Sequence, residues 1–183
     1  MKTVNIVLCG LGGQGILFMT KVLAWAAVNE GLNILGAETH GMAQRGGSVT
    51  SHLRLGDVKG SLVRAGTANF LISLDDTEAY RNLPFLAKGG EIYVNVNPEV
   101  FPEEKVRIFL NNKKVTYHAL NAGNIAQDLG TPLSTNLALL GHFSAFREGP
   151  LGYENMRKTI QQISPGVLKK INLTIFDAGY KRA

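Results

Sequence analysis

The sequence predicts an α/β fold: a single-domain, three-layer, Rossmann-like and mostly parallel sheet with helices on both faces and a helical C-terminal third. Three observations lead to this fold. Apolar strand-like segments alternate with segments of helical periodicity, and a glycine-rich turn follows the first of them. The 183 residues are 45% hydrophobic and 18% charged, which suffices for one buried core. Since no linker divides the chain, we expect one domain over residues 1–183.

The first predicted strand, residues 4–9, leads through the glycine turn into a helix over residues 13–30. Apolar side chains recur along this helix with the helical period, at Ile16, Met19, Leu23 and Ala27. Further apolar side chains occupy its other faces, and a helix that is apolar nearly all round is buried on more than one side. We therefore expect another polypeptide chain to close one of those sides.

Further strands are predicted in the middle of the chain, over residues 32–37, 48–55, 68–74, 91–95 and 114–119. Alternation of apolar and polar residues predicts that the strand over 48–55 is half exposed. Asp75 and Glu78 stand at capping-box spacing and predict a helix start. We expect this helix to run to about Ala87 and to end at the glycine pair 89–90.

The last third is predicted to form helices over residues 122–129, 135–146, 153–163 and 165–180. Ser164 is expected to cap the last helix, with Pro165 in its first turn. Residues 146–183 carry 7 Lys/Arg against 3 Asp/Glu, whereas residues 1–145 carry 12 against 11. These cations are spaced along helices without interleaved aromatic residues, so we interpret them as a solvated or partner-facing surface and expect no nucleic acid.

Composition also limits the possible cofactors and the location. The single cysteine, Cys9, cannot form an internal disulfide or hold an iron–sulfur cluster, and we interpret it as a small buried hydrophobe. The opening residues do not fit a signal peptide, and no run reaches the roughly 18 apolar residues of a membrane span. We expect a cytoplasmic protein without membrane contact.

The first glycine loop, Gly10-Leu11-Gly12-Gly13-Gln14-Gly15, has the G-x-G-x-x-G spacing of dinucleotide-binding turns. Such glycines let the backbone approach a pyrophosphate, which backbone N–H groups at the helix start then bind. The same glycines also serve a close crossover between strand and helix. Both interpretations remain open from the motif alone.

The second glycine loop is His40-Gly41-Met42-Ala43-Gln44-Arg45-Gly46-Gly47-Ser48-Val49, and it follows Glu38. Glu38 stands near the position of the acidic ribose reader in an NAD-binding domain. The loop itself offers donors suited to a carboxylate or phosphate, with Arg45 giving the strongest contact. Alternatively it packs flat against a partner, or its polar residues satisfy local carbonyls. No metal-ligand histidine spacing, G-x-S-x-G elbow or P-loop accompanies it.

The two loops together resemble the gamma-type domain of the 2-oxoacid:ferredoxin oxidoreductases. The resemblance continues through residues 71–84, 89–95 and 136–141, so that it covers nearly the whole chain. Within this superfamily, the second loop is similar to that of the small (beta) subunit of indolepyruvate ferredoxin oxidoreductase. Pyruvate- and oxoglutarate-type relatives resemble a Phe-Gly-Pro-Glu-Arg-Arg-Gly or Tyr-Gly-Pro-Glu-Ala-Arg-Gly pattern at this place.

The resemblance implies a non-autonomous subunit of a thiamine-diphosphate-dependent enzyme. Its reaction would be oxidative decarboxylation of indolepyruvate or another aryl-pyruvate with coenzyme A, giving the acyl-CoA, carbon dioxide and reduced ferredoxin. Thiamine diphosphate, Mg²⁺ and [4Fe–4S] clusters are expected in a large partner subunit, with ferredoxin as electron acceptor. This chain lacks both the cysteines and the Gly-Asp-Gly thiamine motif, and we expect it to bind none of these cofactors alone.

No residue of this chain is expected to be catalytic. The residues expected near substrate or cofactor are Gly10, Gly12, Gly13, Gln14, Gly15, His40, Gly41, Met42, Gln44, Arg45, Gly46, Gly47, Ser48 and Asn136. Two alternatives remain: a stand-alone NAD(P)- or nucleotide-binding Rossmann protein, in which Glu38 reads the ribose, and a purely structural interaction module.

Overall fold

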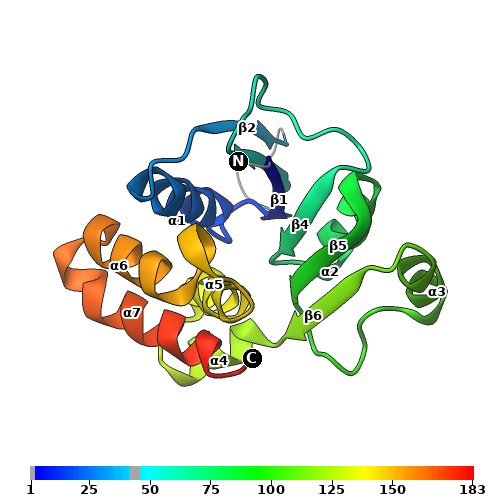
Figure 1. Ribbon diagram of the computed structural model, residues 1–183. Coiled ribbons are helices and arrows are strands. Elements are labelled where there is room, and N and C mark those ends of the chain that lie inside the picture. The colour runs from blue at the N-terminus through cyan, green and yellow to red at the C-terminus, as the bar shows by residue number, and fades with distance from the viewer. Residues whose placement is uncertain (1–2, 42–45) are drawn as a thin grey trace.

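The computed structural model describes residues 3–41 and 46–183, which form a six-stranded sheet between two layers of helices (Figure 1). The strand order is β2-β3-β1-β4-β5-β6. Strand β3 is antiparallel to both of its neighbours, and the pairs β1–β4, β4–β5 and β5–β6 are parallel. The strands are β1 (Val4–Leu11), β2 (Ile34–His40), β3 (Ser48–Leu55), β4 (Ala68–Ser73), β5 (Leu86–Asn95) and β6 (Thr116–Leu120). The predicted fold class is confirmed.

Most helices lie on one face of the sheet: α1 (Ile16–Asn29), α4 (Ala122–Asp128), α5 (Thr135–Ala145), α6 (Tyr153–Ile163) and α7 (Gly166–Tyr180). The other face carries α2 (Asp76–Asn82) and α3 (Glu104–Asn112). Three short 3₁₀ turns are η1 (Leu83–Phe85), η2 (Pro132–Ser134) and η3 (Gly149–Leu151). The C-terminal third is helical, as predicted.

Alternate residues of the central strand β1 supply the two cores. Ile6 and Leu8 face the helices α1 and α5, whereas Val7 and Cys9 face α2. Cys9 is fully buried, as predicted, and its Sγ donates to Ser73 Oγ at 3.2 Å. Burial raises the pKa of this thiol to about 12, so it stays protonated.

The helix after β4 is shorter than predicted. Asp75 caps α2 through its carboxylate, which accepts from the Glu78 N–H at 3.0 Å, as the spacing predicted. The helix nevertheless ends at Asn82, because Pro84 lies in η1 and cannot continue a helix. The glycine pair 89–90 therefore lies inside β5, where the pairing with β4 is irregular. No element was predicted for residues 104–112, which form α3.

Two further expectations concern exposure and capping. The predicted alternation along β3 holds for buried Val49, Ser51, Leu53 and Leu55 and for partly exposed Thr50 and Arg54. His52 departs from it: this side chain is buried, and its Nδ1 accepts from the Val63 N–H at 3.1 Å because the loop after β3 folds back over it. Ser164 does not cap α7, whose first flanking residue is Pro165. Its hydroxyl accepts instead from Asn172 at 3.0 Å.

Helix α1 is buried on its sheet-facing side and leaves an apolar stripe on the other. Leu17, Trp25 and Val28 are 43%, 48% and 43% exposed in the isolated chain. That another chain covers this stripe stays a prediction. Among the helices of residues 3–41 and 46–183, none is both long and apolar enough to cross a membrane.

Candidate functional site

The two glycine loops lie against each other at one edge of the sheet. The Gly12 N–H donates to Gly47 O at 2.8 Å, and the Gly46 N–H donates to Gly12 O at 3.2 Å. At the base of the second loop, the Gly41 N–H donates to Ser48 O at 2.9 Å. We call the edge formed by residues 10–15, 40–41 and 46–48 the glycine edge. Folding thus brings together two motifs that are some 30 residues apart in the sequence.

The first loop is closed by its own side chain. The amide oxygen of Gln14 accepts from the Leu11 N–H at 2.7 Å. It also occupies the space beside Gly10, where a Cβ atom would lie 2.6 Å from Gln14 Oε1 and 2.9 Å from Ile16 Cδ1. A side chain at position 10 would therefore displace the Gln14 amide or the end of Ile16. Gly13 has open space beside it and a φ of +98°, so its requirement is conformational.

Gly15 serves the contact between α1 and α5. Its φ is +86°, and a Cβ atom there would overlap the amide of Asn136. Asn136, at the start of α5, is buried and donates from Nδ2 to Gly15 O at 3.3 Å. Gly13 and Gly15 have left-handed φ values, which a helix cannot contain. The helix α1 therefore begins at Ile16, three residues after the predicted start at Gly13. Close packing thus accounts for the glycine at both positions: against the turn and the start of α1 at Gly10, and against α5 at Gly15.

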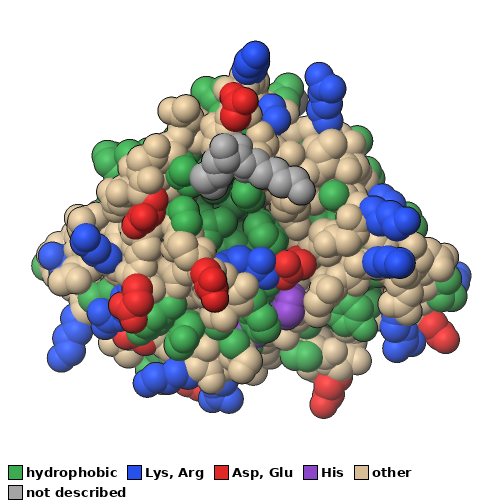
Figure 2. Space-filling model, in the orientation of Figure 1, with side chains coloured by type: hydrophobic (Ala, Val, Ile, Leu, Met, Phe, Trp, Pro, Cys, Tyr) green, Lys and Arg blue, Asp and Glu red, His purple; other side chains and the backbone are tan. Residues whose placement is uncertain are grey.

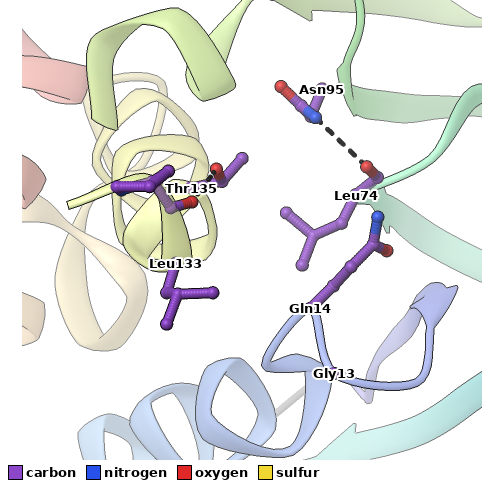
Figure 3. A pocket seen from close by; sticks show the side chains of 7 residues that line it. Gly13, Gln14, Leu74, Asn95, Leu133 and Thr135 are labelled. Carbon is purple, nitrogen blue, oxygen red and sulfur yellow. Dashed lines mark hydrogen bonds between the residues drawn. The ribbon is translucent and has the colours of Figure 1, made fainter. Parts of the chain in front are cut away.

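A cavity of about 200 Å³ opens beside the first loop (Figure 3). Figure 3 shows Gly13 and Gln14 on one side, Leu74 and Asn95 at the strand ends, and Leu133 and Thr135 opposite. Asn95 Nδ2 donates to Leu74 O at 3.2 Å. The strands β1 and β4 are neighbours, and the chain continues from β1 toward one side of the sheet, to β2, and from β4 toward the other side, to β5. The cavity lies at the carboxyl ends of these strands, where α/β sheets commonly bind ligands.

Five cavity residues were not singled out from the sequence: Leu74, Asn95, Pro132, Leu133 and Thr135. The available signal was position, since Leu74 directly follows a predicted strand and Asn95 ends one. Leu133 is 86% exposed, which places a large apolar side chain at the mouth of the cavity. No local pattern marks such a residue.

Glu78 is a further residue that the sequence analysis treated only as part of a helix cap. Its carboxylate accepts from Ser48 Oγ at 2.6 Å, although Glu78 is only 3% exposed. The Arg81 Nε lies 3.7 Å from the other carboxylate oxygen, and its side chain is largely exposed. A buried carboxylate thus ties the second glycine loop to α2.

His40 is exposed at the end of β2 and lies 3.6 Å from Glu38 through Nε2. The strand β2 continues to His40, three residues beyond its predicted end. Met42, Gln44 and Arg45 lie outside the described residues, so their roles stay predictions.

The strand order bears on the nucleotide-binding alternative. In a dinucleotide-binding domain the acidic ribose reader ends a strand next to β1. Here antiparallel β3 lies between β1 and β2, so Glu38 stands two strand spacings, about 10 Å, from β1. The geometry therefore disfavours Glu38 as a ribose reader for a nucleotide on the first loop.

Comparison with known proteins agrees with the predicted resemblance. Residues 5–182 match the family described as pyruvate ferredoxin/flavodoxin oxidoreductase. The chain is 36% identical over 190 residues to the indolepyruvate oxidoreductase subunit IorB of Archaeoglobus fulgidus, covering 98% of this chain and 94% of that one.

Two solved structures share the fold. The gamma subunit of a keto/oxoacid ferredoxin oxidoreductase from Geobacter sulfurreducens has a TM-score of 0.75 and 22% identity, covering 98% of both chains. A 2-oxoglutarate:ferredoxin oxidoreductase from Magnetococcus marinus, solved with 2-oxoglutarate, coenzyme A and succinyl-CoA bound, has a TM-score of 0.76 and 18% identity. This chain spans 99% of its own length but 31% of that protein's chain. The family match and the curated relative show that the chain belongs to the pyruvate ferredoxin/flavodoxin oxidoreductase family, as a subunit of a 2-oxoacid:ferredoxin oxidoreductase.

Proposed function

We propose that this chain is the non-autonomous small subunit of an indolepyruvate-type enzyme, and that its glycine edge forms one wall of an active site shared with a large subunit. The reaction is the oxidative decarboxylation of an aryl-2-oxoacid with coenzyme A, with reduction of ferredoxin. The observation that supports the proposal is the pairing of Gly12 with Gly46 and Gly47, which joins the second motif to the first loop, whose Gly13 and Gln14 line a cavity.

The donor set of this chain does not fit the redox cofactors of such an enzyme. A [4Fe–4S] cluster needs several thiolates, whereas the whole sequence has one cysteine, which is buried against Ser73. Within residues 3–41 and 46–183, no three His, Cys, Asp or Glu side chains are grouped to hold a metal ion. We assign thiamine diphosphate, Mg²⁺ and the clusters to the large subunit.

In this proposal the residues of this chain bind the substrate or coenzyme A and shape the wall of the shared active site. The first loop and Leu133 border the cavity. His40, Gln44 and Arg45 offer donors for the carboxylate of the oxoacid or for phosphate groups of coenzyme A. The Glu78–Ser48 hydrogen bond keeps the base of the second loop in place.

Co-expression with the large subunit tests this function. The purified complex is expected to reduce ferredoxin with indolepyruvate and coenzyme A, and the isolated chain is expected to be inactive. Within the complex, Arg45→Ala is expected to raise the KM of the oxoacid or of coenzyme A about tenfold or more, as loss of a charge-assisted contact would.

Arg107→Ala is the matched control, because Arg107 is an exposed arginine on α3, far along the sheet from the glycine edge. The control complex should keep the wild-type kinetic constants. Wild-type turnover and KM for both substrates in the Arg45→Ala complex would contradict the assigned role of the loop. Saturable NAD(P) binding by the isolated chain would favour the stand-alone nucleotide-binding alternative instead.

A further inference from the structure

A second cavity, of about 300 Å³, lies at the opposite edge of the sheet from the glycine edge. Val4 and Phe70, near the starts of β1 and β4, line it together with Leu32, Leu55 and Leu151. Figure 2 shows a hollow with hydrophobic side chains at the centre of the face, with Arg or Lys, acidic and His side chains close together beside it. This edge has no part in the function proposed above.

Arg147 lines this cavity, and hydrogen bonds to residues of β5 fix its guanidinium. Its Nη2 donates to the Tyr93 hydroxyl at 2.7 Å and to the Glu91 carboxylate. The guanidinium carbon lies 4.5 Å from the centre of the Phe70 ring. His118 Nε2 is 3.5 Å from the same Glu91 oxygen. We call Glu91, Tyr93, His118, His142 and Arg147 the Arg147 cluster.

Arg147 is not fully satisfied by these contacts. Its Nε is buried without a hydrogen-bond partner among the described residues. A guanidinium has five N–H donors, and the contacts named above use only those of Nη2. The buried Nε cannot reach a ligand, but Nη1 makes no hydrogen bond among the described residues and is not one of the buried unpaired atoms, so a molecule in the cavity that brings an acceptor would gain by pairing with it.

The charges around the cavity select against a charged ligand. Glu91 neutralises Arg147, and Glu148 adds an exposed carboxylate at the rim, while His118 lies behind with a pKa lowered chiefly by burial. A carboxylate ligand would meet Glu148 and compete with Glu91. A cationic ligand would meet Arg147 and lose its hydration in an apolar lining.

We propose that this cavity is a binding site for an uncharged aromatic molecule of one or two rings that carries a hydrogen-bond acceptor. Phe70 and Phe146 supply aromatic surfaces for the ring, and Arg147 supplies the donor. The volume is in the range of small-molecule sites. The site is separate from the glycine edge and lies at the opposite ends of the strands.

The test uses the full-length chain and three probes with the same ring: benzamide, benzoate and benzylamine. Benzamide is expected to shift the methyl signals of Leu32, Leu55 and Leu151 in NMR spectra and to bind about fivefold or more tightly than either charged probe. Shifts centred on Leu74 and Leu133, no shifts at all, or tightest binding by a charged probe would overturn the proposal.

Two variants make the assignment specific. Val4→Phe and Leu32→Phe each place a ring in the cavity and are expected to weaken benzamide binding about tenfold, so the failure of one variant to fold leaves the other. Leu35→Phe is the matched control, because Leu35 is an exposed strand residue outside the cavity lining. Equal benzamide affinity in all three folded variants would show that the probe binds elsewhere and would overturn the proposal.

Discussion

The two edges of the sheet are built in different ways. At the glycine edge, missing side chains define the geometry: Gly10 and Gly15 leave room for Gln14 and Asn136, and backbone atoms join the loops. At the opposite edge, large side chains define it, with Arg147 fixed between Phe70, Tyr93 and Glu91. Backbone conformation should therefore control the first edge, and charge and packing the second.

The largest effect is expected where an added side chain meets both strain and overlap. Gly15→Val places a β-branched residue at a φ of +86° and against Asn136, so we expect a loss of about 4 kcal/mol in the free energy of unfolding. Gly13→Val meets strain alone and should lose about 2 kcal/mol. Urea denaturation of both variants measures the difference, and equal losses would remove Asn136 from the explanation.

A pH dependence is expected from the Arg147 cluster. Burial, followed by repulsion from His118, lowers the pKa of His142 to about 4 from an ordinary 6.5. As the pH falls, His142 is protonated in the unfolded chain before it is protonated in the folded chain. The contribution of neutral His142 to the free energy of unfolding is therefore fully present above pH 6.5 and is lost as the pH falls toward 4. The loss is on the order of 3 kcal/mol.

Unfolding measured across this pH range tests that expectation. His142→Gln should flatten the pH dependence of stability, whereas His40→Gln, at an exposed position, should leave it unchanged. The burial of His118 lowers its pKa as well, so a smaller slope of the same sign should remain in His142→Gln. An unchanged slope in this variant would exclude His142 as its main source.

A smaller effect is expected from removing the guanidinium. Arg147→Met leaves Glu91 with His118 and Tyr93 alone, and since both partners are partly exposed we expect a loss of about 2 kcal/mol. Arg157→Met breaks the more exposed pair with Asp177 and should lose about 1 kcal/mol or less. The two free energies of unfolding are compared by urea denaturation. Equal losses would mean that partial burial does not strengthen the Arg147–Glu91 ion pair relative to the more exposed Arg157–Asp177 pair.

The smallest effect concerns the tie between the second loop and α2. Ser48→Ala removes one hydrogen bond from the buried Glu78 carboxylate and should cost about 1.5 kcal/mol. Ser61→Ala, whose hydroxyl makes no hydrogen bond among the described residues, should stay within about 0.5 kcal/mol of the wild type. A loss of that small size in Ser48→Ala as well would mean that the loop does not depend on Glu78.

Local signals predicted much of this structure. The bounds of β3 and α6, the cap at Asp75 and the first glycine turn follow from nearest neighbours in the sequence, and the structure has them as expected. The helix predicted to reach Ala87 ends instead at Asn82, because Pro84 cannot continue it, and this proline is itself a local signal in the sequence.

Other features depend on contacts that no local pattern carries. The insertion of β3 between β1 and β2 is a choice of strand order, and it decides the distance of Glu38 from the first loop. The bond between Ser48 and Glu78 joins residues 30 positions apart. Arg147 was predicted only as part of a basic helical surface. Its guanidinium is partly buried and donates to the carboxylate of Glu91, 56 positions away.

Hydrogen–deuterium exchange of this chain, alone and in complex with the large subunit, tests the central claim most directly. Backbone amides of residues 10–15 and 46–48 are expected to exchange more slowly in the complex, because the glycine edge meets the partner's active site. Amides of residues 146–151, at the opposite edge, are expected to exchange at unchanged rates. Protection of residues 146–151 without protection of the glycine edge would contradict the account.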